Sequence, residues 1–197
     1  TTIPNNQMLA VITQECNNLK HSLNKFKRGA GVKFFTVKSD SNSSQNLILR
    51  VLDSFLFMFW VIIYMIRVRP KKIYISTDPP IIVPFVVAIY SKIVNCRYYY
   101  HIQDIHPEIT NVLFKINSFF FKFLKKLDNF TIQNAYLIIT LTEGMKSEII
   151  YRSGVKSKIE IIQNPSASLN ESNFLSKKRK KKGFVFTGNL GRLQRIP

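Results

Sequence analysis

The 197-residue sequence contains few acidic residues and few cysteines. It has 11 Asp and Glu against 29 Lys and Arg, so its formal net charge at pH 7 is +18. So large a positive excess favours an anionic partner such as a membrane surface, a nucleic acid or a phosphorylated substrate. The two cysteines, Cys16 and Cys96, form neither a metal-binding pattern nor a disulfide framework. Their scarcity favours a reducing, cytosolic compartment.

No hydrophobic run in the sequence is long enough to cross a bilayer. The longest, Phe55 to Ile66, has 12 apolar residues, and about 20 are needed. We expect a buried helix here. Because Arg67, Arg69, Lys71 and Lys72 follow at once, a helix lying in an anionic membrane surface is the alternative. The N-terminus is polar and has no signal-peptide pattern.

Three familiar nucleotide and catalytic signatures are also missing. The sequence contains no Walker A loop, no serine-hydrolase elbow and no G-x-G-x-x-G fingerprint, which argues against P-loop ATPases, hydrolases and dehydrogenases. No second cluster of ligands accompanies the histidines, so we expect no metal. Six consecutive cations, residues 177–182, lack interleaved aromatic residues. We therefore expect a solvated linker there and no nucleic-acid partner.

The segments that are present alternate between strand-like and helix-like patterns. This alternation predicts an α/β fold with a mostly parallel, Rossmann-like sheet and helices on both faces. A polar, basic stretch over 166–183 predicts a linker between a first domain, 1–165, and the opening strand and turn of a second domain, 184–197. The predicted strands are 33–37, 73–77, 98–102, 136–140 and 159–162, and the predicted helices are 5–27, 47–66, 81–94, 112–127 and about 142–154.

Ligands of parallel α/β sheets bind beyond the carboxyl ends of the strands, and polar side chains follow three of the predicted strands. The richest cluster contains His101, Asp104, His106 and Glu108 within eight residues. Imidazole and carboxylate groups together suit acid–base chemistry or the steering of a substrate hydroxyl. The alternative is that Asp104 caps the next helix and the histidines are ordinary loop residues.

Two further polar segments each allow a structural and a functional interpretation. Thr142, Glu143 and Gly144 follow a strand, where they suit either the capping of a helix or contact with a ligand. Near the end of the chain, a Gly188-Asn189-Leu190-Gly191 turn follows a short strand. Backbone N–H groups in such a turn can approach a phosphate closely, although an ordinary strand-to-loop turn has the same pattern.

Taken in order, these segments resemble a known family. The order resembles that of the group 1 / family 4 glycosyltransferases of the GT-B fold, and is most similar to bacterial surface-polysaccharide sugar transferases of the WbuB type. The resemblance extends over residues 70–196. The segments that carry it are Ser76–Pro80, Asp104–Glu108, Leu141–Met145, Gly154-Val155, Ile161–Pro165 and Phe186–Gly191.

The resemblance implies two Rossmann-like domains facing a cleft, with this chain supplying the acceptor side. Such enzymes move a sugar from a nucleotide-diphosphate sugar, usually with retention of configuration and without a metal or other cofactor. Acceptors in the subgroup are often polyprenyl-linked sugars, so the resemblance implies a cytoplasmic protein that is peripheral on the inner face of the cell membrane.

The resemblance also assigns roles to individual positions. Asp104 and Glu108 become candidate catalytic residues in the segment that lines the cleft, while His106 stands where the family usually has an aromatic residue. The remaining matches are Thr142, Glu143 and Gly144 at the cleft edge, Asn164 before the linker, and Gly188, Asn189 and Gly191 near the donor diphosphate. His101 and His106 are further candidate substrate contacts.

Two segments of the family pattern are expected outside the chain. The first strand with its Gly-rich loop would precede Thr1, and the rest of the donor domain would follow Pro197. A chain of this extent is expected to bind the donor poorly. The alternatives are a nucleotide-sugar 2-epimerase on the same scaffold, a non-catalytic fragment, or a basic membrane-binding module.

Overall fold

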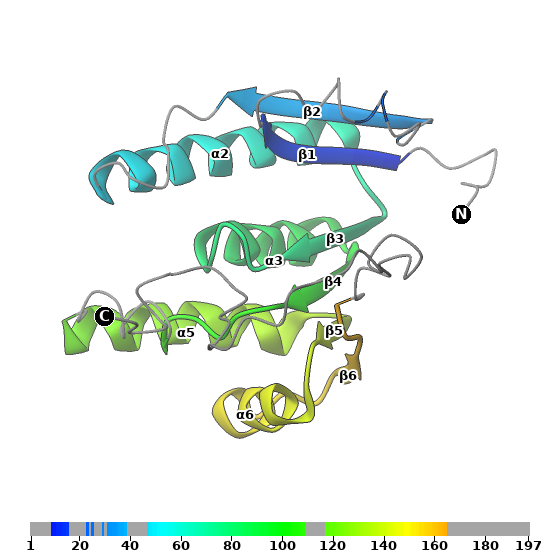
Figure 1. Ribbon diagram of the computed structural model, residues 1–197. Helices are drawn as coiled ribbons and strands as arrows, with labels where there is room; N and C mark the ends of the chain where they lie inside the picture. Colours follow the sequence, from blue (N-terminus) through cyan, green and yellow to red (C-terminus); the bar gives the residue numbers. More distant parts are fainter. Residues whose placement is uncertain are drawn as a thin grey trace, which may run out of the picture.

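The computed structural model describes residues 9–15, 31–38, 47–108 and 117–164, together with Leu23, Lys25 and Gly29. Two parallel sheets flanked by helices make up this part of the chain (Figure 1). The predicted α/β fold with a parallel, Rossmann-like sheet is confirmed, although the helices that connect the strands of the larger sheet lie on one face of it and not on both. The smaller sheet pairs β1 (Leu9–Glu15) with β2 (Val32–Lys38), and the larger has the order β3 (Lys72–Ser76), β4 (Arg97–Ile102), β5 (Leu137–Thr140) and β6 (Lys158–Ile161).

Four helices lie side by side along the sheets. In the larger sheet the spatial order of the strands is their order in the chain, so right-handed crossovers place successive helices on one face. Each helix contacts the next in the series. The helices are α2 (Leu47–Val68), α3 (Ile82–Val94), α5 (Ser118–Asn134) and α6 (Glu143–Ser153).

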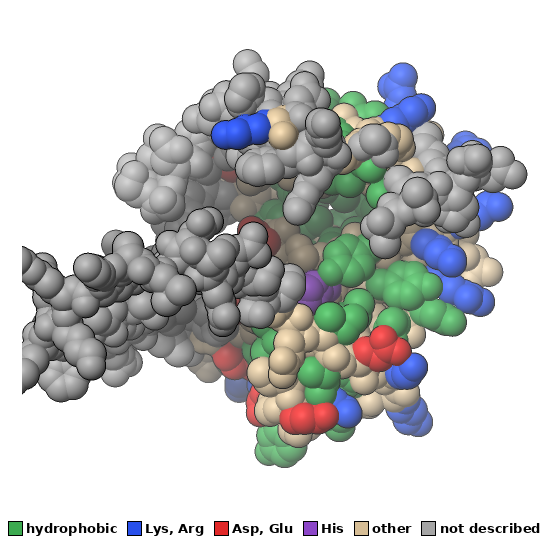
Figure 2. All heavy atoms as spheres, turned by 45° about the vertical axis from the view of Figure 1, so that its right-hand side comes forward, with side chains coloured by type: hydrophobic (Ala, Val, Ile, Leu, Met, Phe, Trp, Pro, Cys, Tyr) green, Lys and Arg blue, Asp and Glu red, His purple; other side chains and the backbone are tan. Residues whose placement is uncertain are grey.

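The surface is basic, and no described helix is long and apolar enough to cross a membrane. Lys and Arg side chains gather along the edge of the face drawn in Figure 2, as the net charge of +18 requires. The predicted linker, residues 166–183, and the predicted second-domain segment, 184–197, lie outside the described residues.

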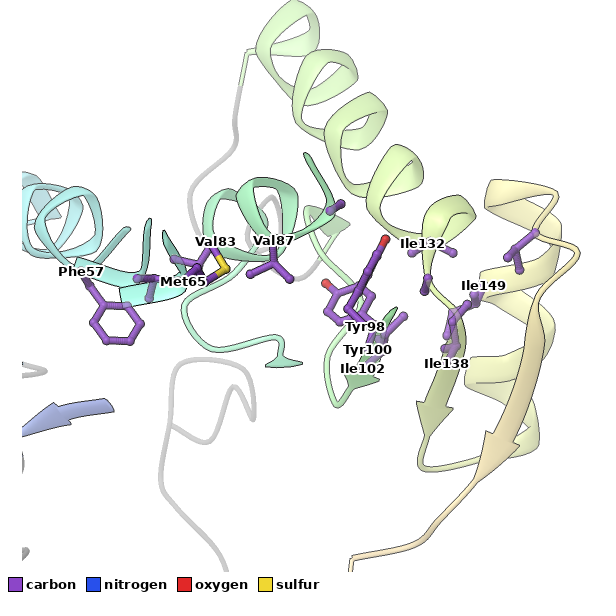
Figure 3. Packing of buried hydrophobic residues seen from close by; sticks show 14 residues of the cluster. Phe57, Met65, Val83, Val87, Tyr98, Tyr100, Ile102, Ile132, Ile138 and Ile149 are labelled. Atoms are coloured by element: carbon purple, nitrogen blue, oxygen red, sulfur yellow. The ribbon is translucent and has the colours of Figure 1, made fainter. Parts of the chain in front are cut away.

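The core lies between the larger sheet and its helices. Alternate residues of β4 point the same way, because successive side chains of a strand face opposite sides, and Tyr98, Tyr100 and Ile102 are buried. Figure 3 shows these three side chains among residues from the helices and β5. Complete burial of a large apolar side chain contributes about 1.5–3 kcal/mol. The core partners include Val83, Val87, Ile132, Ile138 and Ile149.

One predicted helix is replaced by a strand. The spacing of apolar residues predicted a helix over 5–27, but Leu9–Glu15 forms β1, which runs parallel to β2 with Leu9 opposite Val32. That prediction is wrong for residues 9–15. Val11, Ile12 and Thr13 are β-branched and favour a strand, and pairing with β2 gives their backbone groups partners that the helical spacing did not reveal.

A second helix is displaced along the chain. The predicted helix 112–127 corresponds to α5, which begins at Ser118 and continues to Asn134. Asn117 caps its start, since the side-chain oxygen of Asn117 accepts a hydrogen bond from Phe119 N. The polar last turns remain helical because Asp128, Thr131 and Ile132 are buried. Residues 112–116 lie outside the described part.

Candidate functional site

The carboxyl ends of the four strands of the larger sheet meet at one edge, as parallel pairing requires. Ser76 lies opposite His101, and Ile102 lies opposite Thr140. The loops after β3 and β4 are joined by a hydrogen bond from Gln103 N to Thr77 Oγ1 at 3.4 Å. The polar segments that follow β3, β4 and β5 are therefore brought together at this edge; they are Ser76–Asp78, His101–Glu108 and Thr140–Gly144.

A hollow of about 360 Å³ opens between the loop after β4 and helix α6. It is lined by Gln103, Asp104, Ile105, Glu108, Met145 and Glu148. Asp104 is exposed on this loop, whereas Glu108 is half-buried. The predicted Asp104–Glu108 segment thus forms one wall of the hollow, and Met145 of the predicted Leu141–Met145 segment contributes to the other together with Glu148.

Glu108 is held by cations from two helices. Arg152 Nη1 of α6 lies 2.8 Å from Glu108 Oε2, and Lys125 Nζ of α5 lies 3.0 Å from Glu108 Oε1. Burial alone would raise the pKa of Glu108, but the Arg152 guanidinium and the Lys125 ammonium outweigh burial and lower this pKa below its ordinary value. An ionised carboxylate with a cation on each oxygen is a poor proton acceptor and a good anchor for its loop.

Arg152 is the centre of this network. Its side chain is 2% exposed, and Nη1 also donates to the backbone oxygen of His106 at 2.5 Å. Nη2 donates to Asp128 Oδ2 of α5, whose other oxygen accepts a hydrogen bond from Tyr100 Oη at 3.3 Å. Arg152 therefore ties the loop after β4 to α5 and to the core strand β4.

Burial shifts the pKa values of Asp128 and Tyr100, the two acidic groups that Arg152 links to the core. It raises the pKa of Asp128, against the opposing effects of the Arg152 charge and the Tyr100 hydrogen bond. Burial also raises the pKa of Tyr100 well above the ordinary value, and the nearby Asp128 carboxylate adds to this effect. Tyr100 therefore stays protonated and remains a donor to Asp128 at neutral pH.

His101 lies on the face of β4 opposite to the core residues. A hydrogen bond of 2.5 Å joins His101 Nδ1 to Tyr74 Oη on β3, and their ring centroids are 5.9 Å apart. Burial lowers the pKa of His101, so its imidazole is neutral at pH 7. Nε2 is buried and finds no hydrogen-bond partner among the described side chains.

The second histidine belongs to the anchored loop. His106 is partly buried, and this burial lowers its pKa while the neighbouring Asp104 carboxylate opposes the shift. The substrate-binding roles predicted for His101 and His106 stay predictions.

The segment after β5 caps a helix. Thr142 Oγ1 accepts a hydrogen bond from Met145 N at 3.2 Å, and Glu143 occupies the first turn of α6, so the capping interpretation is confirmed. Glu143 is exposed and lies 3.6 Å from Lys146 Nζ. Gly144 has a negative φ and room for a Cβ, with Thr142 Oγ1 at 3.9 Å as its nearest neighbour. Ligand contacts of these three residues stay predictions.

The remaining predicted site residues lie at or beyond the end of the described part. Asn164 is exposed just after β6, while Gly188, Asn189 and Gly191 lie outside the described residues. Within the described ranges, no group of three or more His, Cys, Asp or Glu side chains is arranged to hold a metal ion.

Sequence reasoning missed three residues that organise the site, namely Arg152, Asp128 and Tyr74. The one signal in the sequence was Asp128, a carboxylate on the apolar face of a helix, which calls for a buried partner. Arg152 and Tyr74 gave no signal, because their partners are distant in the chain.

Comparison with known proteins gives one distant structural likeness to report. No protein-family model matches the chain, and no curated protein matches it. Among solved structures, the chain is similar to Glycyrrhiza uralensis UGT73P12 complexed with glycyrrhetinic acid 3-O-monoglucuronide, a plant glycosyltransferase. The two share 10% sequence identity at a TM-score of 0.48, over 75% of this chain and 41% of that one. The chain thus spans less than half of that structure, and we base the functional proposal on its own residues.

Proposed function

We propose that this chain is the acceptor-side part of a retaining glycosyltransferase of surface-polysaccharide synthesis. It would transfer a sugar from a nucleotide-diphosphate sugar to a polyprenyl-linked glycan at the inner face of the cell membrane. One observation carries the proposal: the two family-like segments, Asp104–Glu108 and Leu141–Met145, contribute to one hollow at the carboxyl edge of a parallel sheet.

In this proposal the two carboxylates of the loop, Asp104 and Glu108, have different roles. The exposed Asp104 orients the acceptor hydroxyl, because a free carboxylate can accept its hydrogen bond and help to remove its proton. Glu108 holds the loop in place through Arg152 and Lys125 and is a positioning residue. Thr142, Glu143 and Gly144 border the acceptor from the start of α6.

The donor would approach from the opposite side of the cleft. The Gly188–Gly191 turn would give its backbone N–H groups to the donor diphosphate. During transfer the bond between the anomeric carbon and the diphosphate oxygen breaks, a bond to the acceptor oxygen forms, and the hydroxyl proton leaves. The proposal includes no metal and no other cofactor.

Replacement of Asp104 tests the proposal. In the protein made from its complete reading frame, Asp104→Asn should lower sugar transfer by roughly a hundredfold or more, which is the usual contribution of a positioned acid–base group. Its circular dichroism and urea midpoint should not change, because Asp104 is exposed. Glu160→Gln, on β6 away from the hollow, is the matched control and should keep full activity. Unchanged turnover of Asp104→Asn would refute the assignment.

A further inference from the structure

Helix α2 is apolar on both of its sides. Its inner side supplies Phe57, Val61 and Met65 to the core. Its outer side carries six large apolar residues at spacings of three and four, each between 41% and 63% exposed. We call these the apolar stripe: Leu52, Phe55, Leu56, Phe59, Ile63 and Ile66.

The apolar stripe is too large to be a collection of isolated surface residues. With about 200 Å² of surface for each large side chain, it exposes roughly 650 Å², slightly above the about 300–600 Å² of the largest apolar patch on a typical monomeric protein. The helix has 22 residues and is therefore about 33 Å long. The burial expected for the apolar run is therefore confirmed for the inner side of the helix, whereas its outer side is exposed.

A basic cluster continues the stripe at its carboxyl end. Arg67, Arg69, Lys71 and Lys72 are all exposed, and none forms an ion pair with an acidic residue in the ranges that the structure describes. The single acidic residue of α2 is Asp53, which is half-buried near the amino-terminal end of the helix. Four neighbouring cations beside an apolar surface complement a layer of phosphates above hydrocarbon, which is the composition of an anionic bilayer surface.

We propose that the apolar stripe and the basic cluster dock this protein on an anionic lipid bilayer. The helix would lie along the surface, with the stripe at the acyl boundary and the cations on lipid phosphates. Such a helix does not cross the membrane, in agreement with the absence of a spanning helix among the described residues. The docking surface deepens the membrane location given in the proposed function by naming the residues that bind lipid, and its test requires no sugar transfer.

Vesicle co-sedimentation of the 197-residue protein tests this surface without any substrate. The protein should bind vesicles of phosphatidylcholine mixed with phosphatidylglycerol and should be released by salt. Phe59→Gln combined with Ile63→Gln should weaken this binding roughly tenfold. Lys71→Gln combined with Lys72→Gln should weaken it by a similar factor on the mixed vesicles, and should leave the weak binding to phosphatidylcholine unchanged.

Helix α6 supplies the matched apolar control, because Figure 1 places it at the far end of the molecule from α2. Ile150 and Tyr151 are 45% and 88% exposed, so Ile150→Gln with Tyr151→Gln removes comparable apolar surface and should leave binding unchanged. Lys156→Gln with Lys158→Gln is the corresponding charge control. All variants should keep the circular dichroism spectrum of the unaltered protein.

Three results would overturn the proposal. The first is unchanged vesicle binding by the Phe59→Gln and Ile63→Gln variant. The second is an equal loss of binding in the α6 control. The third is a concentration-dependent dimer in sedimentation velocity that the Phe59→Gln and Ile63→Gln variant abolishes, because a second copy of the chain would then cover the apolar stripe.

Discussion

Replacement of Arg152 by Met should destabilise the protein by about 3–5 kcal/mol at neutral pH. Arg152 and Asp128 are paired with side chains only 2% and 4% exposed. Removal of one partner from such a buried pair leaves the other charge without compensation, which costs about this much. The loss of the Glu108 contact adds less, because the Glu108 side chain is 31% exposed and keeps Lys125.

The effect should depend on pH in a defined direction. Burial already raises the pKa of Asp128, and without Arg152 the folded-state pKa should rise further. A carboxyl group whose pKa is higher in the folded than in the unfolded protein destabilises the fold only when it is ionised. The destabilisation caused by Arg152→Met should therefore shrink as the pH falls towards 3.8, the ordinary pKa of an Asp side chain. Above the folded pKa the full penalty remains.

Urea unfolding, followed by the fluorescence of Trp60, the single tryptophan, measures this effect. Arg97→Met is the matched control, because Arg97 is exposed and its Cζ lies 4.6 Å from the centroid of the Tyr136 ring. This control substitution should lower the unfolding free energy by at most about 1 kcal/mol. Adding Asp128→Leu to Arg152→Met should recover a large part of the loss. A loss below about 1 kcal/mol, or purely additive effects in this cycle, would refute the buried pair.

Two smaller predictions concern the edges of the site. Thr142→Ala should lower the unfolding free energy by about 1 kcal/mol through loss of the α6 cap, whereas Thr142→Ser should keep most of the stability; equal urea midpoints for Ala and the unaltered protein would contradict the cap. His101 should titrate in NMR below its ordinary pKa of 6.5 because burial disfavours its charged form. The unfolded state then binds more protons, so the contribution of His101 to stability should fall as the pH drops through 6.5; a measured pKa at or above 6.5 would contradict the burial.

The sequence predicted the larger sheet well. Its strands are short segments rich in β-branched or aromatic residues, and turn signals follow them, as at Asp78-Pro79 after β3. The start of α6 was predictable for a similar reason, because Thr142 and Glu143 form a local capping pattern that needs no distant partner.

The features that could not be predicted from the sequence depend on contacts between segments that are distant in the chain. Strand β1 was missed because its apolar residues also fit a helical spacing, and only pairing with β2 decides between the two. The loop of Asp104 and Glu108 was predicted from its position after β4. Its anchoring by Arg152 was not, because that residue lies on α6, beyond α5 and β5 in the chain, and reaches the loop only in the folded protein.

Transfer of labelled sugar to lipid is the measurement that tests the central claim most directly. The protein from its complete reading frame would be incubated with a membrane extract and a panel of labelled UDP- and GDP-sugars, and the organic phase would be counted. The account predicts that one donor labels the lipid fraction with retained anomeric configuration, and that Asp104→Asn abolishes this labelling. Epimerised nucleotide-sugar formed without an acceptor, or no labelled lipid from any donor, would contradict it.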